Sequence, residues 1–277
     1  MSKGNLKEKL KEIQKDIPIE EGSLATYVGL IEVQEEAKGF YAEKFRDIDV
    51  EKVQEGFKEG KPAFLSLPLE ISEEDIEKAY AAVTGYLSES LPETREPIAR
   101  IEESRKTGEL RLKELSDALF AGDEEHVHGV AERVGVDPEI LEAVIAWSLQ
   151  PIFQALSDAV SSKVDFSTWT SGRCPVCGGP TKLEYVDAGG HAHLRCQFCG
   201  TEWGYPEGKC PYCGNSDRKT VVEIPVKGED KFKLMVCYKC GGYWKVVDER
   251  VVGGGVPREL YDIWSFRLDL LATGGER

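Results

Sequence analysis

The chain has 277 residues, of which 41% are hydrophobic and five are tryptophan, enough for two domains with buried cores. Its net charge of −15 is uneven: residues 1–165 hold 20 Lys and Arg against 36 Asp and Glu, whereas residues 166–277 hold 15 against 14. The acidic half argues against a surface for nucleic acid or anionic membranes there, because phosphate binding depends on Lys and Arg.

The first 134 residues are predicted to be helical almost throughout. Apolar residues recur at helical spacing over residues 5–16, from Ser23 onwards and over residues 50–57. Residues 63–68 are expected to form an apolar connector that is extended before its proline. Ser72 begins another helix with a capping-box pattern. A later helix carries His126 and His128, which point to different faces and are expected at the surface.

A longer helix is predicted over residues 138–161. Asp137-Pro138-Glu139 combines an N-cap acceptor, a proline at the first helical position and an acid in the first turn. Apolar residues then follow the helical period to Val160, so this is the expected core helix, and Pro151 should kink or split it. Residues 1–165 are therefore predicted to be an acidic all-helical domain, a bundle of six to eight helices.

All eight cysteines follow, as four pairs with two residues between the members of each pair. Two intervening residues let both sulfurs of a tight turn face one ion, and two such turns complete a tetrahedral site. A glycine follows each pair, at a position where a sharp turn favours positive φ. The sequence thus predicts two four-cysteine metal sites, with these ligands: Cys174, Cys177, Cys196, Cys199, Cys210, Cys213, Cys237 and Cys240.

An internal repeat indicates how the cysteines group. Residues 173–179 match residues 209–215, and residues 196–203 match residues 237–244, so each repeat holds its own four ligands. Hairpins are expected over 182–194 and 219–236, with a further strand over 243–247. The repeats are predicted to be two rubredoxin-like or zinc-ribbon modules, over 166–206 and 207–252, with Trp203 and Trp244 packed over their cores. Residues 253–277 are expected to be a hinge and a C-terminal helix over 257–272.

Other uses of the cysteines fit less well. The charged segment from Lys3 to Lys15 has no apolar signal core and no run of eighteen apolar residues occurs, so we expect a cytoplasmic protein with reduced thiols. Four repeated pairs resemble neither a single redox pair nor a cubane cluster motif. A site of four sulfurs suits both zinc and iron, so the metal stays open. Modules of about 35 residues depend on such metals to fold.

No enzyme is predicted. Two closed sites leave no coordination position for a substrate, and nucleophile, P-loop and dinucleotide motifs were not found. We therefore assign no catalytic and no cofactor-binding residue, and expect no small-molecule substrate.

Four stretches carry a resemblance to a known family: residues 169–178, 194–203, 209–216 and 237–243, with weaker agreement at 149–151 and 268–272. They resemble FdhE, the formate dehydrogenase accessory proteins. The resemblance implies a helical domain followed by two rubredoxin-like domains whose cysteines are associated with iron. It also implies a cytoplasmic assembly factor, or chaperone, that binds the molybdenum- or tungsten-containing catalytic subunit of formate dehydrogenase and is not itself an enzyme.

The residues alone are also compatible with two other functions. Zinc ribbons often bind DNA or RNA, although the acidic half and the nearly neutral ribbons weigh against it. A rubredoxin-like electron carrier is the other, because iron held by four sulfurs cycles between two oxidation states. Zinc in both sites would exclude it.

Overall fold

The computed structural model describes the backbone of residues 3–274 and the side chains of residues 6–274. The chain divides into two compact units. Unit 1 comprises residues 1–24, 48–68 and 157–277, and unit 2 comprises residues 25–47 and 69–156. The helices are α1 Lys3–Ile13, η1 Gln14–Asp16, α2 Glu21–Lys38, η2 Gly39–Tyr41, α3 Val50–Lys58, α4 Ala63–Ser66, α5 Glu73–Ser90, η3 Pro92–Thr94, α6 Arg95–Thr107, α7 Leu112–Ala121, α8 Glu124–Val134, α9 Pro138–Ser161, α10 Glu249–Val252, η4 Arg258–Leu260, α11 Tyr261–Trp264 and α12 Phe266–Thr273. The strands are β1 Leu183–Val186, β2 Ala192–Arg195, β3 Glu202–Gly204, β4 Val221–Ile224, β5 Phe232–Cys237 and β6 Tyr243–Asp248.

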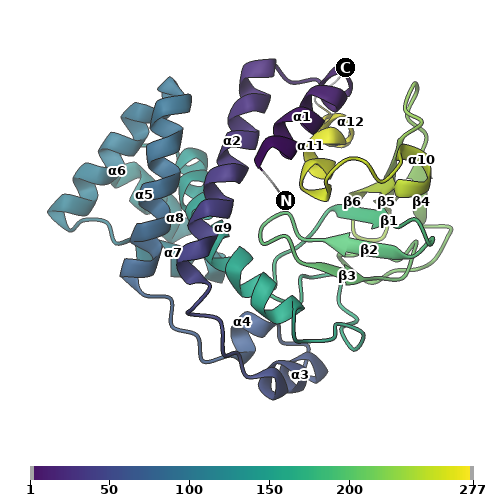
Figure 1. Ribbon diagram of the computed structural model, residues 1–277, viewed down its shortest axis with the longest axis horizontal. Coiled ribbons are helices and arrows are strands. Elements are labelled where there is room, and N and C mark those ends of the chain that lie inside the picture. Colours follow the sequence, from purple (N-terminus) through teal and green to yellow (C-terminus); the bar gives the residue numbers. More distant parts are fainter. Residues whose placement is uncertain (1–2, 275–277) are drawn as a thin grey trace. The chain divides into compact units, whose positions relative to one another are not determined.

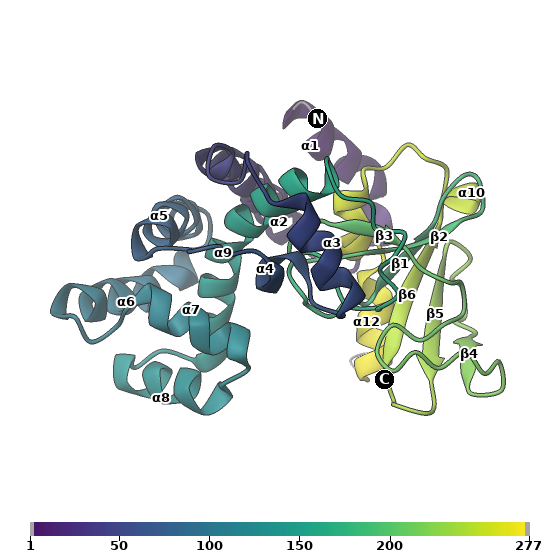
Figure 2. The same ribbon diagram turned by 90° about the horizontal axis from the view of Figure 1, so that it is seen from below.

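Unit 2 is helical, as predicted. The capping box at the start of α5 is present, because the Asp75 amide donates to the Ser72 hydroxyl oxygen and the Ser72 amide donates to the Asp75 carboxylate. Helix α5 packs with α6 and α7, and α8 packs with the same two helices (Figure 2). In α9, the residues of the predicted apolar face in this unit are buried: Leu141, Ile145, Leu149 and Ile152. Pro151 lies inside α9, and the helix continues through it without being split.

The apolar composition of α9 raises the question of whether this helix spans a membrane. This helix is long and apolar enough to cross a membrane, but 61% of its most apolar stretch is buried within the structure. Burial of this kind is typical of the core helix of a soluble protein, the role that the sequence predicts for it.

The two cysteine modules share one six-stranded sheet in the order β3-β2-β1-β6-β5-β4 (Figure 1). The first module supplies β1 to β3 and the second supplies β4 to β6. All pairings are antiparallel except that of β1 with β6, in which Leu183 lies opposite Lys245. Sequence patterns predicted every strand but β3, which has only three residues, and they gave no indication that the modules join. Joining pairs the inner edges of both modules, which separate modules would leave open.

Two N-terminal segments belong to unit 1, although the sequence placed them in a helical domain of residues 1–165. The Asp16 carboxylate accepts bonds from Lys231 Nζ at 2.6 Å and Trp264 Nε1 at 3.1 Å. Residues 63–66 form α4 where an extended connector was predicted. Helical periodicity identifies an apolar face but not its partner, so the compact units cut across the expected ranges. The ranges 1–165, 166–206, 207–252 and 253–277 stay a prediction about folding units.

The C-terminal segment is broken where one helix over 257–272 was predicted. Ser265 separates α11 from α12, and its hydroxyl donates to the Tyr261 carbonyl at 2.7 Å. Helix α12 packs against β6, a strand of the second cysteine module (Figure 2). Beneath it, Lys245 of β6 is completely buried and binds Asp262 at 2.6 Å and Asp269 at 2.5 Å.

Candidate metal centres

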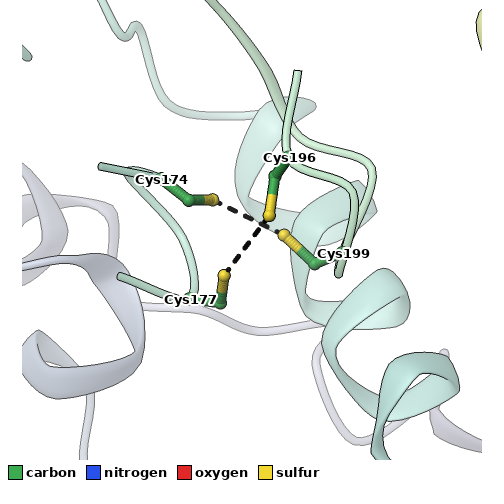
Figure 3. A group of neighbouring side chains, drawn as sticks. All are labelled: Cys174, Cys177, Cys196 and Cys199. Carbon is green, nitrogen blue, oxygen red and sulfur yellow. Dashed lines mark hydrogen bonds between the residues drawn. The ribbon is translucent and has the colours of Figure 1, made fainter. Parts of the chain in front are cut away.

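The eight cysteines lie in two groups of four, in the pairing order that the repeats predict. In the first group, Sγ of Cys174 lies 3.5 Å from Cys199, and Sγ of Cys177 lies 3.6 Å from Cys196 (Figure 3). In the second group, the corresponding distances are 3.6 Å between Cys210 and Cys240 and 3.7 Å between Cys213 and Cys237.

These distances suit a metal site and exclude disulfides. A tetrahedron with metal–sulfur bonds of about 2.3 Å has sulfur–sulfur edges of about 3.8 Å, whereas a disulfide bond is about 2.05 Å long. All eight cysteines are free thiols. Each group could therefore hold one metal ion, and we refer to the groups as the first and second cage.

The turns that carry the sulfurs follow one design. In the first turn, the Gly178 amide donates to the Cys174 carbonyl at 3.0 Å, and the Cys174 amide donates to the Gly179 carbonyl at 2.9 Å. The same pair of bonds recurs at Cys210 with Gly214 and Asn215. Gly178 and Gly214 have φ values of 77° and 70°, a conformation that side chains disfavour. Glycine after each second cysteine is therefore required by the backbone.

The first cage is enclosed by protein. All four of its cysteines are buried, and amides of Val176 and Gly179 donate to Sγ of Cys174 and Cys177 at 3.4 Å. The Thr201 hydroxyl lies 3.0 Å from Cys199 Sγ. Burial raises the pKa of the Cys174 thiol well above its usual value. Because buried anions are costly without a counter-charge, four thiolates here require a bound cation.

The second cage reaches the surface. Cys210 and Cys237 are buried, whereas Cys213 and Cys240 are exposed. Burial raises the pKa of Cys210 to about 12. Burial also acts to raise the pKa of Cys237, but hydrogen bonds from Asn215 and from the amides of Lys239 and Cys240 outweigh it and lower that pKa to about 6. The two cages are therefore alike in geometry but differ in access to water.

Both predicted packing tryptophans are buried, and Trp244 lies beside the second cage. Trp203 donates from Nε1 to the Ser171 carbonyl at 3.2 Å. Trp244 packs with Cys210 and Cys237 and donates from Nε1 to Glu184 Oε2 at 2.9 Å. Glu184 lies on β1, so this bond joins the first module to the core of the second. Burial raises the pKa of Glu184 to about 7, although the Trp244 hydrogen bond partly offsets it.

Glu184→Gln is expected to stabilise the protein at neutral pH. Because the folded-state pKa of Glu184 is raised, the native state binds its proton more tightly than the unfolded state, and stability falls as pH rises from about 4.5 to 7. Glutamine keeps an acceptor for Trp244 without the buried charge. The gain should reach roughly 3 kcal/mol above pH 7 and shrink towards pH 5, as measured by urea unfolding. An advantage that is the same at both pH values would contradict this.

The four histidines lie outside both cages. His126 and His128 lie on α8, beside Glu114 and Glu142. His193 Nε2 lies 3.1 Å from Asp187 and its ring stacks on Tyr185, while His191 is exposed near Asp187.

The sequence missed three features around the cages: α4, the buried Glu184 and the buried Lys245. The last two lie in strands whose neighbours are apolar, a signal that their side chains face the interior.

Comparison with known proteins gives one consistent group. No protein-family model matches the chain. It is 28% identical over 233 residues to a protein FdhE homolog of Aquifex aeolicus, covering 81% of this chain and 74% of that protein. Identity to protein FdhE of Escherichia coli is 25% over 247 residues, covering 87% and 74%. The crystal structure of the FdhE protein from Pseudomonas aeruginosa superposes with a TM-score of 0.64 over 99% of this chain and 93% of that one. At 17% sequence identity, this shows a shared fold.

Proposed function

We propose, from the membership of this chain in the FdhE family, that it is an accessory protein of formate dehydrogenase. In this role it binds the catalytic subunit of a molybdenum- or tungsten-dependent formate dehydrogenase in the cytoplasm and is needed for its activity. Similarity to FdhE proteins over at least 81% of the chain carries the proposal. The alternatives, nucleic-acid binding and electron transfer, have no comparable support.

The cages support a scaffolding role. The residues proposed to hold the metals are the four cysteines of each group, with iron or zinc as the ion. Bound metal supplies a rigid tetrahedral crosslink between two turns, and all its positions are filled by sulfur. No position is then left for substrate water, which supports a protein that is not an enzyme.

The direct test uses a host strain that lacks the gene for this chain. Formate dehydrogenase activity should fall at least tenfold in that strain and return when the gene is supplied. Tagged protein isolated from the complemented strain should carry the large subunit of formate dehydrogenase, identified by mass spectrometry. A tagged rubredoxin serves as the control, because it shares the sulfur cage alone. Unchanged activity together with no recovered large subunit would overturn the proposal.

The second cage is expected to lose its metal first. Cys213 and Cys240 are exposed, whereas all four sulfurs of the first cage are buried. An excess of chelator should remove one metal per chain at least tenfold faster than the other, as followed by released metal. Mass spectrometry with a thiol-alkylating reagent should then find label on the second-cage cysteines. Equal release rates, or label on Cys174 and Cys196 first, would contradict the assignment.

A further inference from the structure

The two cysteine repeats have matching turns with different surroundings. Residues 174–178 and 210–214 have matching sequences and matching backbone hydrogen bonds. We call the first the covered turn, because another segment of unit 1 binds both of its middle carbonyls, those of Pro175 and Val176. We call the second the open turn, because Gly172 covers the Pro211 carbonyl while Tyr212 is exposed. The contacts of the covered turn show what kind of polypeptide segment packs on a turn of this shape.

The occupant of the covered turn is the start of α4. The amides of Ala63 and Phe64 donate to the carbonyls of Pro175 and Val176 at 2.8 Å and 3.0 Å. The ring of Pro62 packs on the turn, since a Cβ atom added to Gly178 would lie 3.1 Å from Pro62 Cγ. The covered turn thus presents two successive carbonyls to two successive amides of a polypeptide. All four cysteines of the first cage are buried beside this pairing.

The open turn forms part of an exposed surface. This surface includes five exposed residues from the two turns of the second cage, and we call these residues the second-cage surface: Tyr212, Cys213, Tyr238, Lys239 and Cys240. Tyr238 is 65% exposed and Tyr212 is 42% exposed. The Tyr212 hydroxyl already donates to the Tyr243 carbonyl at 2.7 Å, so Tyr212 contributes its ring alone. Exposed tyrosines such as Tyr238, with an apolar ring and a hydroxyl, are common in protein interfaces.

The charged side chains around the second-cage surface indicate what kind of partner it would bind. The amide of Tyr238 donates to the Thr220 carbonyl at 2.8 Å, so the preceding loop, with exposed Arg218 and Lys219, lies against the turn that carries Lys239. These three cations outnumber the exposed carboxylate of the same loop, Asp217, on a chain whose net charge is −15. Complementary charge is a general feature of specific interfaces, so a partner here should carry carboxylates.

We propose that the second-cage surface docks a segment of a client polypeptide that combines acidic side chains with an apolar residue. The segment donates a backbone amide to the Tyr212 carbonyl of the open turn, as Phe64 does to the equivalent Val176 carbonyl of the covered turn. The Pro211 carbonyl of the open turn is already covered by Gly172. Its apolar side chain packs on Tyr238, and its carboxylates face Lys239, Arg218 and Lys219. The inference deepens the proposed function, on which it rests, by assigning the client's binding surface.

The test compares two double variants in the full chain under anaerobic, reducing conditions. Tyr238→Ala with Lys239→Glu alters the second-cage surface without removing a metal ligand. Leu65→Ala with Lys61→Glu is its matched control, because Leu65 is 67% exposed and Lys61 is exposed next to the covered turn. Metal content and circular dichroism should be the same in both variants and the unaltered protein.

Binding to purified formate dehydrogenase catalytic subunit is then measured by calorimetry. We expect the Tyr238 and Lys239 variant to bind at least tenfold more weakly, and the control to bind within twofold of the unaltered protein. Equal binding by both variants would overturn the docking surface while leaving the proposed function intact. An unaltered protein that does not bind the subunit would instead refute the proposed function.

The same variants also test two other possible occupants of the second-cage surface, RNA and a second copy of the chain. Single-stranded RNA that binds through Lys239, while the subunit does not, would overturn the inference in favour of a nucleic-acid surface. Self-association that the Tyr238 and Lys239 variant abolishes, measured by light scattering, would assign the surface to a second copy of the chain and overturn it too.

Discussion

Replacing Cys174 with serine is expected to unfold the first cysteine module while unit 2 keeps its helices. A structural site of four thiolates contributes about 10–16 kcal/mol in small metal modules, as much as the whole stability of a typical domain, about 5–15 kcal/mol. Cys174 is completely buried, and the turn it begins accepts the backbone bonds of Ala63 and Phe64. Loss of this cage should therefore release α4 together with β1 to β3.

Hydrogen exchange read by mass spectrometry would map the loss. Residues 174–204 should lose protection, and residues 69–156 should keep it. Cys210→Ser should expose β4 to β6 in the same way and also weaken β1, whose inner edge pairs with β6. Tyr238→Ser is the control, since this side chain lies on a cage turn but is not a ligand. Loss of protection throughout α5 would contradict the expected division.

Lys245→Ala is the second change with a large expected effect, a destabilisation of about 3–5 kcal/mol. Nζ of this buried lysine binds the carboxylates of Asp262 and Asp269, and its removal leaves both without their buried cation. Burial acts to raise the pKa of Asp269, but Lys245 and Lys182 outweigh it and lower that pKa. The stabilisation is therefore present above the ordinary carboxyl pKa and is lost as pH falls through the lowered value.

Urea unfolding of metal-loaded protein at pH 7 measures the change. Lys182→Ala is the matched control, because Lys182 binds the same Asp269 at 2.9 Å but is 40% exposed, so less than about 1 kcal/mol is expected. Lys245→Met combined with Asp269→Leu should recover much of the loss, since apolar replacement of a buried pair is often tolerated. A Lys245→Ala effect no larger than that of Lys182→Ala would show that the buried cation contributes little.

Local sequence patterns predicted the parts of the structure that depend on neighbours in the chain. The spacing of Cys174 and Cys177, with glycine at position 178, defines a turn within a few residues, and the matching repeat defines which turns meet. Helical periodicity likewise identified α5 and α9. Each signal lies within one element, so one sequence is enough to find it.

Features that depend on distant partners could not be predicted in this way. The bond between Asp16 and Lys231 joins residues 215 positions apart, and the sequence of neither segment indicates that it contacts the other. The parallel pairing of β1 with β6 depends on the shape of both modules once folded. Ser265 breaks the C-terminal segment although the apolar residues on either side keep a helical period. The covering of one cage by α4 was missed for the same reason.

The parallel seam between β1 and β6 constrains how this chain can be divided. Strand β1 belongs to the β1–β2 hairpin and β6 lies beside the β4–β5 hairpin. The buried side chains of β1 include Leu183 and Tyr185. A truncated product that stops after residue 206 would leave this inner edge bare, a ready template for strands of other molecules. Ribosomal synthesis must therefore reach residue 248 before the first half of the sheet is protected from aggregation.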